Sequence, residues 1–319
     1  MAIAVEAISE EKELIPAEWS MLNGLLSALQ RLDRLLEQSI VVAPQTFGAD
    51  AQADRFRGLH ISPDEVARLL QRPPVEPLFP WNVTQVDEEA VTETSKLGWL
   101  VHSFGLSQFD LDVLLIALAP ELDLRYERLY AYLQDDVTRR RPSVDLALNL
   151  LCPTAVERML RQAHFAPEAP LLRHGLMRLS ADPHHTQPPL LAYFLKPDEQ
   201  FVRWMLDTNG IDTRLVGFAR TVVLHAASAE VPLNEEALRA FASLSAQLDQ
   251  HWGQTTIYLQ GPRDSGKQQL VETLACESNA RLLCVDLERA ANTTSEEFAE
   301  RLKLLCRAAF LQDAILFLE

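Results

Sequence analysis

The sequence lacks long apolar runs, has few cysteines and carries fewer basic than acidic residues. No stretch of about 18 apolar residues occurs, so no membrane-spanning helix is predicted. The chain has 4 cysteines and no C-x-x-C spacing, so we expect buried, reduced thiols in apolar segments rather than a metal site. With 29 Lys and Arg against 45 Asp and Glu, the net charge is -16, which argues against a general affinity for nucleic acid or anionic membranes.

The N-terminus also lacks an export signal. Residues 1–14 are acidic and have neither the basic start nor the apolar core of a signal peptide, so we expect a cytoplasmic protein. What the chain does have is an ordinary globular composition, 48% hydrophobic and 23% charged, over 319 residues. Two or three domains are expected at this length.

The most informative segment lies near the C-terminal end. An apolar strand is predicted at residues 256–260, followed by a tight loop and then by a helix that opens at Lys267. Gly261 and Gly266 stand five positions apart with Lys267 directly after, which matches the phosphate-binding pattern G-x-x-x-x-G-K. The backbone N–H groups of such a loop form a concave anion site, and the following helix adds its positive N-terminal end. The predicted binding residues are Gly261, Pro262, Arg263, Asp264, Ser265, Gly266, Lys267 and Gln268.

This loop departs from the pattern in two ways that bear on what it binds. Gln268 replaces the Ser or Thr whose hydroxyl normally ligates Mg²⁺, and its carbonyl sits on a longer arm, so Mg²⁺ binding stays open and no metal ligand is assigned. Asp264 places a negative charge inside an anion site, which should weaken nucleotide affinity. The expected cofactor is ATP or ADP.

The residues after the loop predict an α/β sheet. A helix is expected at residues 268–278, a strand at 281–287, a helix capped by Thr294 and Glu297, and a further strand at 314–318. Strand, loop, helix, strand, helix and strand is the order that builds a parallel sheet with helices on its faces. A glycine turn in some other α/β fold is the alternative.

Residues 255–319 resemble the first half of an AAA-family ATPase module, whose loop commonly reads G-P-P-G-[ST]-G-K-T. The matching residues are Gly261, Pro262, Ser265, Gly266 and Lys267, and the departing ones are Arg263, Asp264 and Gln268. The resemblance implies an Asp-Glu pair at the end of the third strand, where this chain has Leu318-Glu319, so Glu319 is the candidate Walker B carboxylate. It also implies two more strands, a sensor residue and an arginine finger beyond residue 319. Because three strands cannot cover both faces of such a sheet, we expect a piece of a longer protein, unless this part leans on the rest of the chain.

Residues 96–209 are predicted to form a winged-helix domain. Short helices are expected at residues 107–119, 124–137, 143–151 and 153–163, then strands at 171–179 and 190–195, and a closing helix capped by Asp198. Short helices followed by a hairpin with a long polar loop are typical of a winged helix. The run FDLDVLLIALAPELDLRYERLYAYLQDD resembles the winged-helix domain ahead of the ATPase modules in bacterial AAA proteins of contractile injection systems. Together the two resemblances span nearly the whole chain.

The predicted winged helix is not basic enough to favour DNA. Residues 143–151, the candidate recognition helix, contain no basic residue, and the basic cluster of this region is Arg139-Arg140-Arg141. A protein-docking role suits the domain better, and nucleic acid is not the expected partner. His184-His185 in the hairpin loop have no carboxylate or Cys at ligand spacing and are expected to be solvated.

Two further regions complete the predicted organisation. In residues 1–95, a leucine-rich amphipathic helix is predicted at 17–38, a short helix at 62–70, and an extended proline-rich connector around residues 72–81. Core packing is favoured over a coiled coil for the first helix, and a docked linker over a proline-recognition ligand for the connector. Residues 210–254 are predicted to be linker helices, one at 213–227 and one capped by Asn234.

The sequence therefore predicts a mainly α N-terminal region with a winged-helix (α+β) domain, followed by a partial α/β P-loop sheet of AAA type at residues 255–319. By resemblance, the expected function is ATP or ADP binding through a degenerate Walker A loop, with little or no hydrolysis by this chain, whereas the full-length parent would be an ATPase. Self-association in a ring, hexameric in the full-length protein, and a protein partner on the winged helix are expected. The alternatives are a nucleotide-free interaction module with a vestigial loop and a winged-helix DNA-binding regulator.

Overall fold

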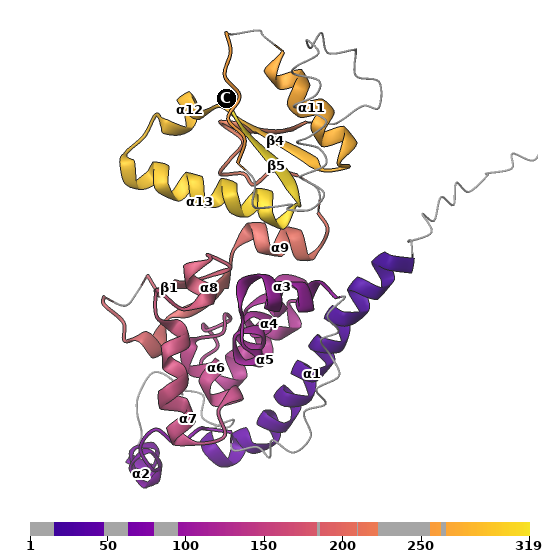
Figure 1. Ribbon diagram of the computed structural model, residues 1–319. Helices are drawn as coiled ribbons and strands as arrows, with labels where there is room; N and C mark the ends of the chain where they lie inside the picture. Colours follow the sequence, from indigo (N-terminus) through magenta and orange to yellow (C-terminus); the bar gives the residue numbers. More distant parts are fainter. Residues whose placement is uncertain are drawn as a thin grey trace, which may run out of the picture. The chain divides into compact units, whose positions relative to one another are not determined.

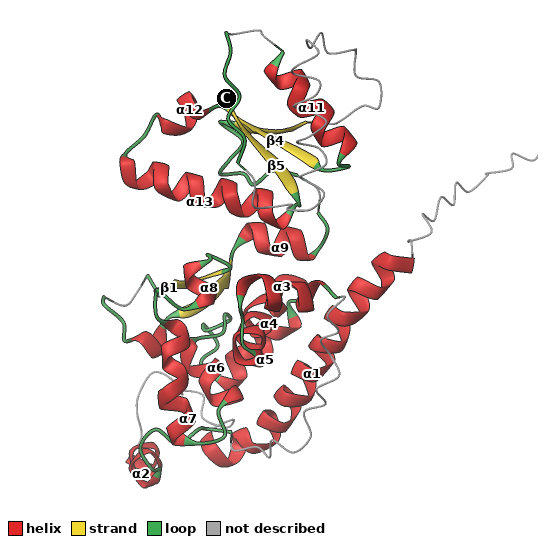
Figure 2. Cartoon of the chain, in the orientation of Figure 1, coloured by secondary structure: helices red, strands yellow, loops and turns green. Residues whose placement is uncertain are grey.

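The computed structural model describes residues 16–47, 63–79, 95–183, 186–208, 210–222, 256–262 and 266–319. Contacts between residues divide the chain into two compact units, the first ending at Asp198 and the second beginning at Glu199. The first unit is mainly helical with a small hairpin, and the second contains a three-stranded sheet with its helices (Figure 1, Figure 2). Within the described residues, no helix has the length and apolar character needed to cross a membrane.

The first unit places a hairpin after a series of short helices, the order expected for a winged helix. Its helices are α1 (Pro16–Phe47), α2 (Pro63–Gln71), α3 (Lys96–Phe104), α4 (Gln108–Leu122), α5 (Arg125–Leu133), α6 (Val144–Leu151), α7 (Ala155–Leu160), η4 (Arg161–Phe165), α8 (Pro170–Arg173) and η5 (Leu190–Ala192). Strands β1 (Met177–Ser180) and β2 (Phe194–Pro197) pair antiparallel. Ser143, just before α6, forms an isolated antiparallel bridge with Phe194, so β2 also pairs at this one residue with the segment that precedes α6.

Helix α4 is largely buried in this unit. The Ser107 hydroxyl accepts from the Asp110 N–H, and the Asp110 carboxylate accepts from the Ser107 N–H at 2.8 Å, which caps the helix start. The sequence predicts that Pro120 ends the helix, but α4 continues past it. Pro120 has no N–H to donate to the Ile116 carbonyl, and the buried Tyr130 hydroxyl donates to that carbonyl instead, at 2.9 Å. The proline is therefore accommodated in the last turn.

Helix α1 packs one stripe of residues against α3, α4, α5 and α6. The buried residues of that stripe are Leu25, Ala28, Leu32, Leu36, Ser39 and Ala43. Polar contacts flank the stripe: Arg31 pairs with Asp112 of α4, and Asp33 accepts from Arg125 Nη2 at 2.5 Å and Tyr126 Oη at 2.9 Å. The prediction of a core-packing helix is confirmed, although α1 runs beyond its predicted end.

The proline-rich connector after α2 is docked on this unit, as predicted. Phe79 is 1% exposed, and its ring meets that of Phe47 edge-on, with centroids 6.4 Å apart. The Leu78 N–H donates to Asn149 Oδ1 at 2.9 Å. These contacts fix the segment against α1 and α6.

The remaining elements of the unit differ from prediction at their ends, and one was missed. Helix α5 ends earlier than expected, and the strands begin later because Pro170 opens α8 and Pro189 precedes η5. Helix α3 was not predicted, although Ser95 caps its start and Gly105 ends it in the left-handed conformation with φ 61°. That pair of cap residues is the sequence signal that reveals it.

The second unit is an α/β arrangement. Its elements are α9 (Glu199–Met205), β3 (Ala219–Val222), α11 (Lys267–Glu277), β4 (Arg281–Val285), α12 (Leu287–Ala291), α13 (Ser295–Leu311) and β5 (Ala314–Leu318). The strand order is β3-β4-β5, with β4 and β5 parallel and β3 antiparallel to β4. The predictions of α11, β4, α13 and β5 are confirmed with small shifts of their ends.

Helices cover both faces of this sheet (Figure 1). On β4, Leu282 and Cys284 lie in an apolar cluster with Val271 of α11. Leu283 and Val285, which point to the other face, lie in a second cluster with buried residues of α12 and α13. The alternation of side chains along a strand thus buries β4 on both faces.

Two predicted elements of this unit are wrong. Residues 256–262 have no regular secondary structure in place of the predicted strand, and Tyr258 is 86% exposed. A strand needs a neighbour for its N–H and C=O groups, and none of the described strands pairs with this segment. Over its described residues 213–222, the linker helix predicted at 213–227 is replaced by turns and β3, with Leu215 and Phe218 in the core. Residues 223–255 lie outside the described part of the chain.

Candidate functional site

The start of α11 carries the described part of the predicted phosphate loop. Gly266 is the N-cap residue, with φ 81° in the left-handed region that favours glycine, and no side-chain hydrogen bond caps the helix. Lys267, the first residue of α11, donates from Nζ to the Gly261 carbonyl at 2.9 Å, so the two ends of the loop are joined. Gly261 and Pro262 are exposed. The loop residues outside the described part of the chain are Arg263, Asp264 and Ser265.

Backbone donors are available at this helix start. The bond from the Leu270 N–H to the Gly266 carbonyl, at 3.0 Å, is the first of the α11 ladder. The N–H groups of residues 267–269 precede that bond and have no acceptor within the helix. The helix dipole and the Lys267 ammonium add positive charge at the same place. The start of α11 therefore offers donors and a cation to an anion.

Gln268 is turned along α11 rather than toward the loop. Its Nε2 donates to Glu272 Oε1 at 2.7 Å, one helical turn later. An amide held in that way does not replace the hydroxyl oxygen that ligates Mg²⁺, so the residues present do not fit this metal. In the described parts of the chain, no group of three or more His, Cys, Asp or Glu could hold a metal ion. His184 and His185 are not among the described residues.

Glu319, the predicted Walker B carboxylate, follows the end of β5. Its N–H donates to the Val285 carbonyl and its own carbonyl accepts from the Leu287 N–H, both at 2.8 Å, which fixes the backbone. Its Oε1 lies 3.5 Å from Nη2 of Arg220 on β3, and both side chains are partly exposed. The described contacts bring Glu319 to Arg220 and not to Lys267. Sequence reasoning missed Arg220 because its segment was predicted to be helical.

The loop and Glu319 nevertheless share one end of the sheet. Helix α11 leads through residues 278–280 directly into β4 and packs on that strand, so it starts near the carboxyl end of β4. Strand β5 is parallel to β4 and ends at the same edge. In open α/β sheets, ligands bind outside the carboxyl ends of the strands. This edge is the candidate site.

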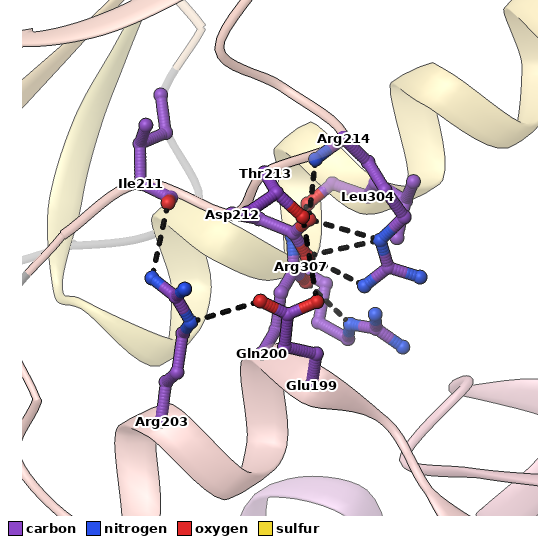
Figure 3. A network of polar contacts seen from close by, with 9 residues as sticks. All are labelled: Glu199, Gln200, Arg203, Ile211, Asp212, Thr213, Arg214, Leu304 and Arg307. Atoms are coloured by element: carbon purple, nitrogen blue, oxygen red, sulfur yellow. Dashed lines mark hydrogen bonds and ion pairs between the residues drawn. The ribbon is translucent and has the colours of Figure 1, made fainter.

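A buried polar network within the second unit ties α9 to α13 (Figure 3). Asp212 is 3% exposed and accepts from Arg214 Nη2 at 2.5 Å. Burial alone would raise the pKa of Asp212, but the hydrogen bonds from Arg214 and the charge of Arg307 outweigh burial and lower the pKa. Arg307 Nε donates to Gln200 Oε1 at 2.8 Å, and Gln200 Nε2 donates to the Leu304 carbonyl at 3.1 Å. The network fixes α9 on the helix that connects β4 and β5.

The first unit does not present a basic recognition surface at the predicted places. Helix α6, the candidate recognition helix, is largely buried, so it is not free to enter a DNA groove. Arg139 pairs with Asp136 at 3.4 Å, and Arg141 pairs with Glu121 at 3.0 Å. Two arginines of the basic cluster are thus already neutralised by neighbouring carboxylates.

A family model described as winged helix domain, variant, matches residues 84–219. No curated protein and no solved structure matches the chain. The chain therefore contains a winged helix domain, in agreement with the sequence prediction and with the order of helices and hairpin. The matched residues continue beyond the first unit through α9 to the first residue of β3, so the end of the matched segment is built into the second unit.

Proposed function

We propose that this chain binds the phosphates of ATP or ADP at the loop between Gly261 and Gln268, and that it is the N-terminal part of an AAA-family ATPase. In this proposal the winged helix domain docks a protein partner or a neighbouring subunit. The observation that carries the proposal is the contact of Lys267 with the Gly261 carbonyl at the uncapped start of α11.

An anion at this point would gain from three features. The uncapped N–H groups at the start of α11 are donors without acceptors in the helix. Lys267 already lies across the loop, and moving its Nζ from the Gly261 carbonyl to a phosphate oxygen exchanges a neutral acceptor for a charged one. The site also lies at the carboxyl edge of the parallel strands β4 and β5. These features support a phosphate site rather than a plain glycine turn.

We do not propose that this chain hydrolyses ATP. Hydrolysis needs a metal ion, a positioned water and a group that stabilises the charge of the transition state. Gln268 is bonded to Glu272, and Glu319 lies beside Arg220, so neither residue is placed as a metal ligand or a base for water. A bound nucleotide would then act as a structural ligand at an interface between subunits of a ring, hexameric in the longer protein.

Isothermal titration of the chain with ADP, with and without Mg²⁺, tests this proposal. A hydrogen bond to a charged group contributes about 1.5–3 kcal/mol, so Lys267→Ala should weaken ADP binding about 10- to 100-fold. Lys303→Ala is the matched control because Lys303 is an exposed lysine of α13, paired with Glu300 at 2.6 Å. Because Gln268 does not fit Mg²⁺, the affinity for ADP measured in EDTA should agree within about threefold with the affinity measured in the presence of Mg²⁺. No heat at millimolar ADP, or equal affinities of the two variants, would contradict the proposal.

A second candidate function is a protein-interaction module whose loop stays empty. Two observations favour it: residues 256–260 form no strand, and α7 exposes apolar rather than basic side chains, among them Met159 at 52% and Leu160 at 69%. This function predicts that ADP binds to neither the wild-type chain nor the Lys303→Ala control. The same titration therefore decides between the two.

A further inference from the structure

An ion pair joins the two outer strands of the second unit at the carboxyl edge of β4. Nη2 of Arg220, on β3, lies 3.5 Å from Oε1 of Glu319, which follows β5. Strand β4 lies between β3 and β5, so these two side chains reach toward each other across the end of β4.

Both side chains lie on the face of the sheet that α11 covers. Arg220 stands directly opposite Cys284 in the antiparallel register, and directly opposed residues share a face. Cys284 lies in the apolar cluster with Val271 of α11. Phe317 of β5 packs against the same cluster, and Glu319 comes two positions later, which returns its side chain to that face. The ion pair therefore lies under α11.

The start of α11 is level with this ion pair. Helix α11 has 11 residues and β4 has 5, and at about 1.5 Å and about 3.3 Å per residue each is about 16 Å long. Residues 278–280 turn the chain back, so Lys267 at the start of α11 comes level with Val285 at the end of β4. The Glu319 N–H donates to the Val285 carbonyl at that level, at 2.8 Å.

Charges from three elements meet around one buried thiol at this edge. Burial raises the pKa of Cys284, the positive charge of Arg220 lowers it, and the negative charge of Glu319 raises it. Glu272 of α11, which accepts from Gln268 Nε2 at 2.7 Å, also raises that pKa. Arg220 is therefore a cation close to the first turns of α11, although it is distant from the loop in sequence.

We propose that the Arg220 guanidinium, held by Glu319, takes the place of Mg²⁺ beside the phosphates of the nucleotide, an inference that rests on the proposed ADP site. In phosphate-transfer sites a carboxylate holds the metal, and the metal neutralises the phosphate oxygens. Here Gln268 does not supply a metal ligand, and the cation beside the carboxylate is a guanidinium. Its Nη2 faces Glu319, and its Nη1 donates to a phosphate oxygen.

The ion pair is loose enough to admit a phosphate and positive enough to keep Mg²⁺ away. The side chains of Arg220 and Glu319 are 53% and 40% exposed, and exposed pairs of this kind contribute little to stability. The charge of Arg220 repels a second cation from the Glu319 carboxylate. Removing Arg220 frees that carboxylate, and Mg²⁺ is commonly bound by one or two carboxylates together with phosphate oxygens and water.

Isothermal titration of the full chain with ADP, in EDTA and in Mg²⁺, tests the proposal. In EDTA, Arg220→Gln should weaken ADP binding about 5- to 30-fold, because a charged but partly exposed donor is lost. Mg²⁺ should then strengthen ADP binding by Arg220→Gln at least about fivefold, whereas wild type should change by less than about threefold. Arg281→Gln is the matched control, because Arg281 is an exposed arginine at the opposite end of β4, and it should bind ADP like wild type.

Two further variants show whether charge is responsible. Arg220→Lys keeps the positive charge and should bind ADP in EDTA more tightly than Arg220→Gln. When Glu319→Gln is added to Arg220→Gln, Mg²⁺ should no longer strengthen binding, because the carboxylate that holds the metal is gone. Far-UV circular dichroism of each variant checks that the fold is retained.

The wild-type titration separates failure of this inference from failure of the proposed function. If wild type binds ADP and Arg220→Gln binds it equally well in EDTA, the role of Arg220 is overturned and the ADP site stands. A loss of affinity in Arg220→Gln that Mg²⁺ does not reverse would also overturn the replacement of the metal. If wild type does not bind ADP at millimolar concentration, the proposed function and this inference are both overturned.

Discussion

The hydrogen bond from the Tyr130 hydroxyl to the Ile116 carbonyl, 2.9 Å long, should contribute measurably to the stability of the winged helix domain. Pro120 removes the helical donor for that carbonyl, and Tyr130 is 0% exposed, so water does not replace the bond. Tyr130→Phe removes the hydroxyl and keeps the ring. It leaves a buried acceptor unsatisfied, and the free energy of unfolding should fall by about 1–3 kcal/mol. Burial raises the pKa of Tyr130 well above its ordinary value, so the hydroxyl stays protonated and the loss should be constant around neutral pH.

Thermal and urea unfolding followed by circular dichroism measure this loss. For a unit of this size, 1 kcal/mol lowers Tm by about 2–4 °C. Tyr258→Phe is the matched control, because Tyr258 is 86% exposed and should tolerate the change. Pro120→Ala restores the N–H that bonds Ile116, so in that background Tyr130→Phe should cost less than about 0.5 kcal/mol. A neutral Tyr130→Phe variant, or an equal loss in both backgrounds, would show that the Tyr130 hydroxyl does not replace the missing donor to the Ile116 carbonyl.

Three further expectations concern charge and reactivity. Asp212→Asn should lower the free energy of unfolding by about 1.5–3 kcal/mol at neutral pH, because Arg214 loses its carboxylate. The pKa of Asp212 is lower in the folded chain than in the unfolded chain, so this stabilisation is fully present above the ordinary Asp pKa of about 4. It is lost as the pH falls through the lowered pKa of the folded state. The difference in Tm between Asp212→Asn and wild type should therefore vanish in acid, and a constant difference would contradict this. Cys306 is exposed, so the expectation that all four thiols are buried is wrong there, whereas Cys152 is buried and burial raises its pKa to about 11. Iodoacetamide near neutral pH should therefore label Cys306 before Cys152, and equal labelling rates would contradict this. Replacing residues 139–141 by alanine should leave a DNA gel shift unchanged, whereas salt-sensitive binding that this change abolishes would favour a DNA-binding regulator.

The elements that sequence predicts well are those whose signals are local. Strand β4 reads as a continuous apolar run because both of its faces are buried, and α13 begins where the Thr294 side chain accepts from the Glu297 N–H. The G-x-x-x-x-G-K spacing likewise predicts the helix that opens at Lys267, and Gly266 precedes that helix in the left-handed conformation. Each of these depends on residues a few positions apart.

The elements that sequence predicts poorly are those that distant partners decide. Residues 219–222 become a strand because Ala219 to Val222 pair with backbone groups of β4 that lie 60 to 66 positions later. Residues 256–260 have strand composition but pair with no described strand. The ion pair of Glu319 with Arg220 and the hydrogen bond from Tyr130 to the Ile116 carbonyl also join segments that no local sequence pattern connects.

Binding of a polyphosphate by the backbone between Gly261 and Lys267 can be followed by NMR of the chain labelled with nitrogen-15 only at glycine and titrated with ADP. The chain has 11 glycines, so the spectrum contains few signals. We expect the amide signals of Gly261 and Gly266 to shift as ADP binds, and that of Gly105 at the end of α3 to stay in place. Signals of Gly261 and Gly266 that stay in place at millimolar ADP would contradict such binding.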